Sequence, residues 1–257
     1  MQTGAITPYI DVAQLVLYAF WIFFAGLIVY LLRENKREGY PLESDRSQRA
    51  PRVKVQGFPR IPEPKTYRLR DGRSVTTPRA EAPDGPLRAH PIGPWPGAPL
   101  QPDGDPMRAE VGPGSYTRRP DIVDTTVDGA PRLVPLRGAL FAGVASRDPD
   151  PRSSPVIAAD GRVAGTVKDL WLDQAEMLFR YLEVAPAGGG AHVLLPINFS
   201  RIDARRVRVR ALLAQQFSGV PTLRSPDTVT MLEEERIMAY YGAGTLYATP
   251  ARQEPLL

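Results

Sequence analysis

The segment Asp173 to Arg180 contains the residue types that proton transfer requires. Asp173 and Glu176 lie in a short connection between two predicted strands, and Arg180 follows on the second strand, on the face that carries Leu178 and Leu182. We expect Arg180 to be half-buried and to pair with one of the carboxylates. Carboxylates pass protons where burial and nearby charges move their pKa toward neutrality. An ordinary turn with a surface ion pair is the alternative, and the residue pattern alone favours it because perturbed sites are the minority.

The composition excludes several kinds of chemistry. The 257 residues include 28 prolines, no cysteine and two histidines, His90 and His192. Without cysteine there are no disulfides, thiolate metal sites or cysteine nucleophiles, and two distant histidines argue against a histidine metal site or a Ser–His–Asp triad. The sequence offers no nucleophile–base pair or phosphate loop, which disfavours a soluble enzyme. The net charge of +4 is too small to indicate nucleic-acid binding.

An uncharged segment near the N-terminus predicts a membrane-spanning helix. Residues 12–32 carry no charge, and as a helix they would be about 31 Å long, which matches the hydrocarbon core of a bilayer. Arg33, Lys36 and Arg37 follow directly, and no basic residue precedes the segment, so we expect residues 1–11 in the periplasm and the remainder in the cytoplasm. A signal peptide would need a basic start and a shorter apolar segment.

Residues 33–120 are predicted to form an extended, proline-rich segment, because 14 of the 28 prolines lie between positions 59 and 120. A β-hairpin is expected at 66–77, where two short strands flank Asp71-Gly72. Residues 78–120 also contain spaced apolar side chains such as Trp95 and Leu100. We therefore expect this stretch to lie along a partner protein rather than to be a free linker.

Residues 121–257 are predicted to form a mainly β cytoplasmic domain with a short C-terminal helix. Short strands separated by turn residues indicate an antiparallel sandwich or small barrel. Residues 206–210 alternate arginine with valine, which we interpret as a solvated strand face, because the aromatic side chains of an RNA-binding surface are missing. Thr230 and Glu233 form a capping box for a helix at 230–241, which Gly242 and Gly244 are expected to end.

Several strings resemble the H subunit of the purple-bacterial photosynthetic reaction centre, a family with one transmembrane helix and a PRC-type antiparallel β-barrel. They run the length of the chain: Asp11-Val12-Ala13-Gln14-Leu15, Arg37-Glu38-Gly39-Tyr40-Pro41-Leu42-Glu43, Pro62 to Thr66, Gly112-Pro113 to Tyr116, Asp169-Leu170-Trp171-Leu172-Asp173 and Tyr247-Ala248-Thr249-Pro250. The resemblance implies a non-catalytic subunit that caps the cytoplasmic face of the L and M subunits. It also implies that this subunit stabilises the complex, shields the quinones and assists proton delivery to the secondary quinone.

The resemblance also implies a setting and a set of partners. Bacteriochlorophyll, bacteriopheophytin, quinones and iron are expected in the partner subunits, and no cofactor in this chain alone. The expected location is the bacterial inner, intracytoplasmic photosynthetic membrane, with membrane lipids, a cytochrome subunit and a light-harvesting ring as further candidate contacts, and no nucleic acid. The alternative is a membrane-tethered PRC-barrel adaptor that binds RNA or a maturation partner.

Residue by residue, the resemblance assigns a proton path to this chain. Glu176 is the first candidate for the relay, Asp173 the second, and Arg180 tunes the electrostatics. Some family members take up protons at a surface histidine pair, but the matching stretch here has Asp128 and Ala130 at those positions. Proton uptake is therefore expected at Asp121, Asp124 and Asp128, with a solvated loop edge as the alternative. Another family acid falls at Thr228, beside Asp227, and is not carried over.

Overall fold

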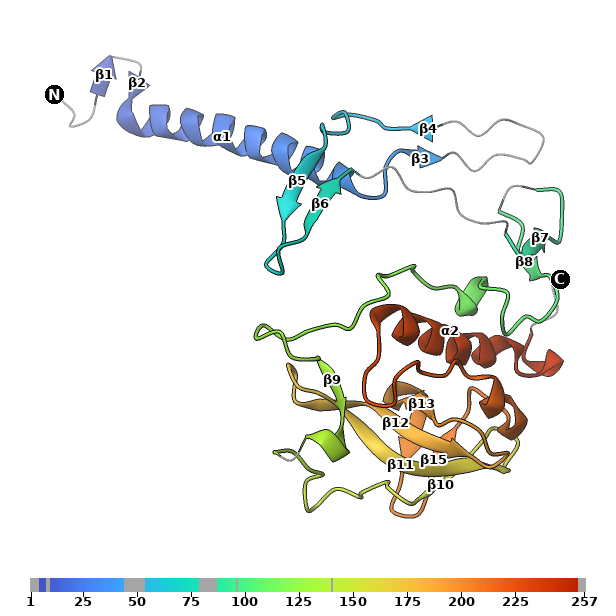
Figure 1. Ribbon diagram of the computed structural model, residues 1–257. Helices are drawn as coiled ribbons and strands as arrows, with labels where there is room; N and C mark the ends of the chain where they lie inside the picture. Colours follow the sequence, from blue (N-terminus) through green and yellow to red (C-terminus); the bar gives the residue numbers. More distant parts are fainter. Residues whose placement is uncertain are drawn as a thin grey trace. The chain divides into compact units, whose positions relative to one another are not determined.

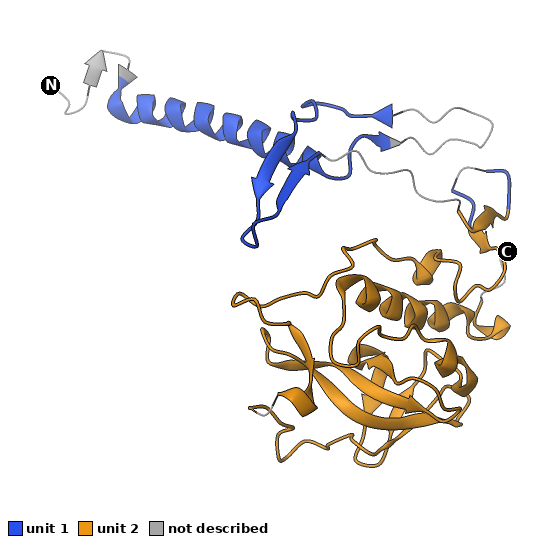
Figure 2. Ribbon diagram, in the orientation of Figure 1, with its two compact units in different colours: residues 1–86, 93–99 blue, residues 87–92, 100–257 orange. Residues whose placement is uncertain are grey.

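The computed structural model describes residues 5–7, 10–43, 54–78, 87–95, 97–139 and 141–253. The chain divides into two compact units (Figure 2), unit 1 with residues 1–86 and 93–99, and unit 2 with residues 87–92 and 100–257. Parts of the predicted segments 1–11, 33–120 and 121–257 lie outside the described residues. Each unit is described by itself below.

Unit 1 is built on one long helix (Figure 1). Strands β1 (Ala5–Thr7) and β2 (Ile10–Asp11) precede α1 (Val12–Glu34), and Asp11 caps the helix by accepting a hydrogen bond from the backbone N–H of Gln14 at 2.7 Å. None of the α1 residues is buried within the unit, although most of them are large and apolar. The helix is long and apolar enough to cross a membrane, and it extends two residues beyond the predicted span.

The basic residues after α1 hold the following segment against the end of the helix. Lys36, in η1 (Asn35–Arg37), is buried and donates hydrogen bonds to the carbonyl oxygens of Gln56 and Pro59 at 2.5 and 2.7 Å. Arg37 donates to the carbonyl oxygen of Thr77 at 3.0 Å and so contacts the end of a hairpin. Short strands complete the unit: β3 (Leu42–Glu43), β4 (Lys54–Val55) and the hairpin of β5 (Lys65–Arg68) with β6 (Ser74–Thr77).

Unit 2 contains a seven-stranded sheet in the order β13-β12-β11-β10-β15-β14, with β9 paired to β11. The strands are β9 (Leu133–Pro135), β10 (Pro155–Ile157), β11 (Val163–Asp173), β12 (Leu178–Pro186), β13 (Val193–Pro196), β14 (Ser200–Ile202) and β15 (Val207–Val209). The mainly β fold class with an N-terminal apolar helix is confirmed. The sheet is not purely antiparallel, because β10 pairs with β15 in parallel, which the long connection between these strands permits.

The remaining elements of unit 2 surround this sheet. A separate hairpin, β7 (Ala89–Pro91) with β8 (Leu100–Pro102), comes first in the chain. The helical turns are η2 (Gly112–Gly114), η3 (Leu136–Gly138), η4 (Ile197–Phe199), η5 (Ala214–Gly219) and η6 (Pro250–Arg252), and the one long helix described in this unit is α2 (Met231–Tyr247). The core lies between α2 and the sheet, where Trp171, Phe217 and Tyr241 are fully buried among leucine and valine side chains.

Helix α2 continues past the glycines that were expected to end it. A Cβ at Gly242 would lie 2.3 Å from the carbonyl oxygen of Pro113, and one at Gly244 would lie 2.6 Å from the carbonyl oxygen of Ala211. These glycines therefore serve close packing of the helix against neighbouring backbone. The predicted end at residue 241 is wrong for this reason, because a glycine in a helix interior and a terminating glycine look alike in sequence.

The second half of the proline-rich stretch packs on this chain itself. Ala109 and Val111 are buried, and a Cβ at Gly114 would lie 3.0 Å from Cβ of Ala243 on α2. Residues 100–120 thus belong to the same compact unit as the C-terminal domain, whereas the contact of 78–120 with a partner stays a prediction. The turn η2 of this stretch packs on α2. Trp95 and Leu100, in contrast, are exposed, each within its own unit.

Candidate functional site

The turn between β11 and β12 gathers the predicted site residues around one buried carboxylate. Asp173 ends β11, and its Oδ1 accepts the backbone N–H groups of Ala175 and Glu176 at 3.0 and 3.1 Å, which fixes the turn. Its Oδ2 accepts hydrogen bonds from Nε of Arg132 at 2.9 Å and from Nε of Arg180 at 3.2 Å. The Asp173 side chain is 1% exposed, so both guanidinium groups are held by a buried anion.

Two further carboxylates complete this group, which we call the Arg132 cluster: Asp124, Arg132, Asp173, Glu176 and Arg180. Oε1 of Glu176 lies 2.5 Å from Nη2 of Arg132 and 3.5 Å from Nη2 of Arg180. Oδ2 of Asp124 lies 3.6 Å from Nη1 of Arg132. The Glu176 side chain is 48% exposed in the unit, so this carboxylate is the one in the cluster that meets solvent most openly.

The electrostatics of Asp173 follow from opposing influences. Burial raises the pKa of the Asp173 carboxyl, but the N–H groups of Glu176 and Ala175 and the neighbouring Arg180 and Arg132 lower it. The result is a pKa below the usual value for aspartate. Asp173 is therefore a permanent anion near neutral pH, and its effect is to orient the arginines.

A second acid near this cluster has the opposite property. The hydroxyl of Tyr181 on β12 donates to Oε2 of Glu234 on α2 at 2.8 Å. Burial raises the pKa of Glu234 above its usual value, although the Tyr181 hydrogen bond and the charges of Arg180 and Arg119 oppose this. The negative charge of Asp124 raises that pKa further. Glu234 is thus a partly buried carboxyl that holds a proton more readily than an exposed glutamate does.

The structure separates the predicted uptake residues. Asp124 belongs to the Arg132 cluster, whereas Oδ1 of Asp121 accepts hydrogen bonds from Oγ1 of Thr230 at 2.7 Å and Nη2 of Arg224 at 2.6 Å, at the start of α2. Asp128 is exposed in the turn between Thr126 and Ala130. The three aspartates therefore do not form one group.

The sequence interpretation missed Arg132 and Glu234. Arg132 lies 41 positions before Asp173 in a loop, and only the pairing of β9 with β11 brings it there. Glu234 did leave a signal, because it occupies an acidic position on the apolar face of a helix, between Met231 and Ile237. A carboxyl on such a face needs a polar partner, which proved to be Tyr181.

A separate network of charges ties the sheet to the loop before α2. Arg137 contacts Asp169 at 3.0 Å, Glu183 at 2.6 Å and Asp227 at 2.8 Å. Glu183 also accepts a hydrogen bond from Nε1 of Trp171 at 3.1 Å and lies 2.7 Å from Nδ1 of His192. Every member has a protein partner, so we interpret this network as structural. Among the described residues, no group of three acidic or histidine side chains is placed to hold a metal ion.

Two known families match the parts of the chain that contain the Arg132 cluster. Residues 4–138, more than half of the chain, match the family described as "Photosynthetic reaction centre, H-chain N-terminal region". The chain belongs to the reaction-centre H-chain family. Residues 144–216 of this H chain match the PRC-barrel domain. The first match contains Asp124 and Arg132, and the second contains Asp173, Glu176 and Arg180.

The family membership confirms the coarse functional prediction. This H chain is a subunit of a photosynthetic reaction centre, with the structural role of its family and with the L and M subunits as its partners. The N-terminal apolar helix suits a single-pass membrane protein. The H-chain match favours this function over the tethered adaptor that would bind RNA.

Proposed function

We propose that this H chain delivers protons to the secondary quinone of its reaction centre through the Arg132 cluster. The observation that carries the proposal is that Glu176, a solvent-accessible carboxylate, lies between two arginines that a buried anion holds in place. Quinone reduction consumes protons, and a quinone that is sealed from water must obtain them through ionisable groups and ordered waters.

The residues of the path have different tasks in this proposal. Asp173 remains ionised and positions Arg132 and Arg180, as its lowered pKa favours. Glu176 exchanges the proton, and its contacts with Arg132 and Arg180 hold the carboxylate in position between transfers. Glu234 and Tyr181 form a second proton-holding pair, on which Arg180 and Asp124 act electrostatically.

Proton uptake is proposed at Asp124 and Asp128. Asp124 contacts Arg132 directly, and Asp128 is exposed in the same loop. Asp121 is already bound by Thr230 and Arg224, which favours a role at the start of α2 over uptake. The path therefore needs no histidine.

Exposed apolar side chains near the cluster support the shielding role. Val127, at the tip of the 126–130 turn, is 72% exposed, and Met177, in the β11–β12 turn, is 60% exposed. The two turns are joined because the backbone N–H of Gln174 donates to the carbonyl oxygen of Arg132. We propose that these side chains dock on the L and M subunits, which hold the pigments, quinones and iron, and that this contact excludes water from the quinone.

The membrane arrangement is part of the same proposal. Arg33 lies in the last turn of α1, and Lys36 and Arg37 follow the helix. This positive charge at one end favours unit 2 on the cytoplasmic side and the N-terminus on the periplasmic side of the photosynthetic membrane. The unburied apolar surface of α1 is available for lipids, for the partner helices and for a light-harvesting ring. A cytochrome subunit would meet only the periplasmic end.

The decisive experiment changes Glu176→Gln in the assembled reaction centre and follows quinone reduction after single flashes. We expect the proton-coupled step after the second flash to slow at least tenfold, because glutamine cannot exchange a proton, and we expect primary charge separation to be unchanged. Glu110→Gln is the control, since Glu110 contacts Tyr116 outside the cluster. Second-flash kinetics equal to those of the unmodified complex at neutral pH would rule out the proposed relay.

A further inference from the structure

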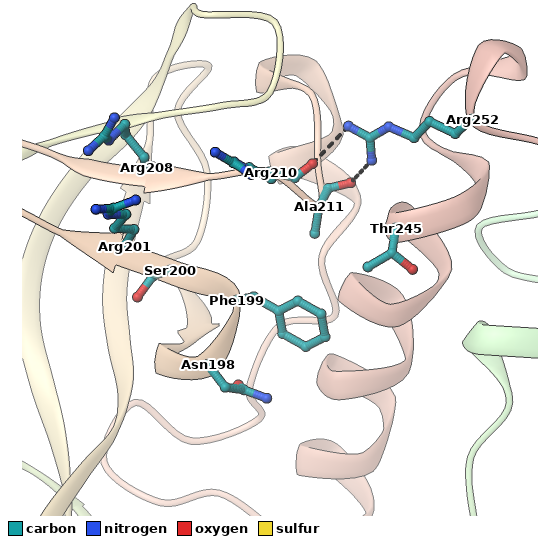
Figure 3. Close-up of a pocket in the computed structure, with 9 residues that line it drawn as sticks. All are labelled: Asn198, Phe199, Ser200, Arg201, Arg208, Arg210, Ala211, Thr245 and Arg252. Carbon is teal, nitrogen blue, oxygen red and sulfur yellow. Dashed lines mark hydrogen bonds between the residues drawn. The ribbon is translucent and has the colours of Figure 1, made fainter.

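A cavity of about 720 Å³ lies at the edge of the sheet in unit 2, away from the residues of the Arg132 cluster. It is lined by residues of η4, β14, β15, α2 and η6, and four of its nine lining residues are arginines: Arg201, Arg208, Arg210 and Arg252. Figure 3 shows these side chains around the cavity. None of these lining residues, all of them in the described part of the chain, is acidic. Its volume is in the range of sites for small organic ligands.

The strand register explains why three of the arginines gather on one side. Arg201 on β14 is the direct cross-strand partner of Arg208 on β15, and Arg210 follows two positions later. Val207 and Val209 alternate with them and are fully buried, so the arginine side chains must leave the opposite face. Like charges directly opposite each other on paired strands are destabilising, and a bound anion would remove this repulsion.

The fourth arginine is fixed in place from across the cavity. Arg252 donates hydrogen bonds to the carbonyl oxygens of Arg210 at 2.7 Å and Ala211 at 2.8 Å (Figure 3). It also donates to the carbonyl oxygen of Gly244 at 2.5 Å. Its positive charge has only backbone partners among the described residues. A guanidinium group held this way is oriented before any ligand arrives, which lowers the entropic cost of binding.

One donor of the cavity is not satisfied within the described part of the chain. Nε of Arg208 is buried there and has no hydrogen-bond partner. The one carboxylate that pairs with Arg208 among the residues the structure describes is Asp203, at 3.5 Å from Nη2. Asp203 also accepts hydrogen bonds from the backbone of its own turn. Arg201 and Arg210 have no carboxylate partner among the described residues. A buried donor without a partner is rare in native proteins and indicates an absent acceptor.

We propose that this cavity binds a phosphate group attached to a larger carbon body. The paired guanidinium groups of Arg201 and Arg208 match the oxygens of a phosphate, and Nε of Arg208 is the donor that such an oxygen would satisfy. The ring of Phe199, which stacks on Tyr241 at 5.7 Å between centroids, provides an apolar wall for the carbon body. A concave site of this size suits a discrete ligand better than an acidic segment of another protein.

The test uses the purified reaction centre in detergent and isothermal titration calorimetry with two probes. One is pyrophosphate, and the other is a short-chain phosphatidylglycerol, with short-chain phosphatidylcholine as the zwitterionic comparison. We expect saturable binding of at least one anionic probe, and salt should weaken it. Saturation by phosphatidylglycerol with competition by pyrophosphate identifies a lipid headgroup as the source, and saturation by pyrophosphate alone identifies a soluble phosphorylated ligand.

Variants locate the binding in this cavity. Arg201→Gln alone and Arg201→Gln with Arg208→Gln should weaken the affinity about tenfold or more, whereas Arg205→Gln should leave it within twofold. Arg205 carries the same charge in the adjoining turn but does not line the cavity. The single variant Arg201→Gln is included because Arg201 is exposed, so its replacement should leave the fold intact even if the double variant misfolds. No saturable heat with either probe would overturn the proposal, as would binding that the variants do not change. If the unmodified complex binds neither probe and the arginine variants lose the L and M subunits, the proposal is overturned and the arginines instead contact a protein partner.

Discussion

A carboxylate that contacts two arginines holds both in place, and Asp173 does this for Arg132 and Arg180. Replacing Asp173→Asn keeps the side-chain oxygen that fixes the turn but removes the charge. We expect the free energy of unfolding to fall by about 1–3 kcal/mol, less than for a fully buried pair because both arginines reach solvent. Urea unfolding of the detergent-solubilised chain measures this, with the exposed Asp148→Asn as the control. A variant as stable as the parent would show that the charge of Asp173 does not stabilise the folded chain.

The pH dependence of that loss has a defined sign. Because the pKa of Asp173 is lower in the folded chain than in the unfolded one, its contribution is present above the unfolded value of about 3.9. It is lost as the pH falls through the folded-state pKa. The difference in stability between the parent and Asp173→Asn should therefore shrink below about pH 4.

Glu234 predicts the opposite pH dependence. Its pKa is raised by burial, so the folded state binds a proton more tightly than the unfolded state, and ionisation costs stability as the pH rises through that raised pKa. Glu234→Gln, which keeps an acceptor for Tyr181, should stabilise the chain by on the order of 1 kcal/mol at pH 8 and have no effect at pH 4. Thermal melts at the two pH values measure this. A stabilisation that is equal at both values would contradict the raised pKa.

At the residue scale the sequence named four of the five residues of the Arg132 cluster: Asp124, Asp173, Glu176 and Arg180. Asp173, Glu176 and Arg180 are close in the chain, so a turn between two strands was enough to bring them together. Arg132 and Glu234 come from other elements, and their contacts depend on strand pairing and helix packing. Local spacing carries no information about such contacts.

Among the elements, α2 has a position that depends on close backbone approach. Gly244→Ala would place a Cβ 2.5 Å from Cδ2 of Leu212 and 2.6 Å from the carbonyl oxygen of Ala211. We expect a loss of about 1–3 kcal/mol of stability, because the backbone must move to accept the methyl group. Gly188→Ala is the matched control, since a Cβ there meets no atom within 4 Å. Equal melting temperatures for the two variants would show that α2 accepts the added methyl group without losing stability.

The elements themselves were largely predictable where their patterns are local. The long β11–β12 pair follows alternating apolar residues, and the capping box at Thr230 and Glu233 marks the start of α2. The end of α2 was not predictable, because the reason for Gly242 and Gly244 lies in Pro113 and Ala211. The parallel pairing of β10 with β15 likewise depends on the whole sheet.

At the scale of the molecule, the folded core belongs to unit 2 alone. Among the described residues, the main cluster of buried side chains runs from Leu133 to Tyr241 and contains no residue of unit 1. A chain that lacks residues 1–35 should therefore keep the cooperative thermal transition of unit 2, and its free energy of unfolding should change by less than about 1 kcal/mol. The same chain should lose its firm attachment to the complex. Differential scanning calorimetry measures the transition. Its disappearance would mean that the helix is needed for the fold.

The sequence indicated two parts but misplaced the boundary between them. Proline content predicted one continuous extended segment, yet residues 100–120 pack on α2 with Ala109 and Val111 buried. Proline restricts the backbone without deciding which surface the segment covers.

The buried Lys36 fixes the rotation of α1 about its own axis. Its ammonium group is held by the carbonyl oxygens of Gln56 and Pro59, so the helix cannot turn without breaking these contacts. Inserting one residue just before Lys36 would rotate the preceding helix by about 100° relative to them. Length changes near Asp11 leave this registration untouched, whereas changes near Glu34 turn every side chain of α1 to a new direction. The direction in which the α1 side chains point is therefore set at the C-terminal end of the helix.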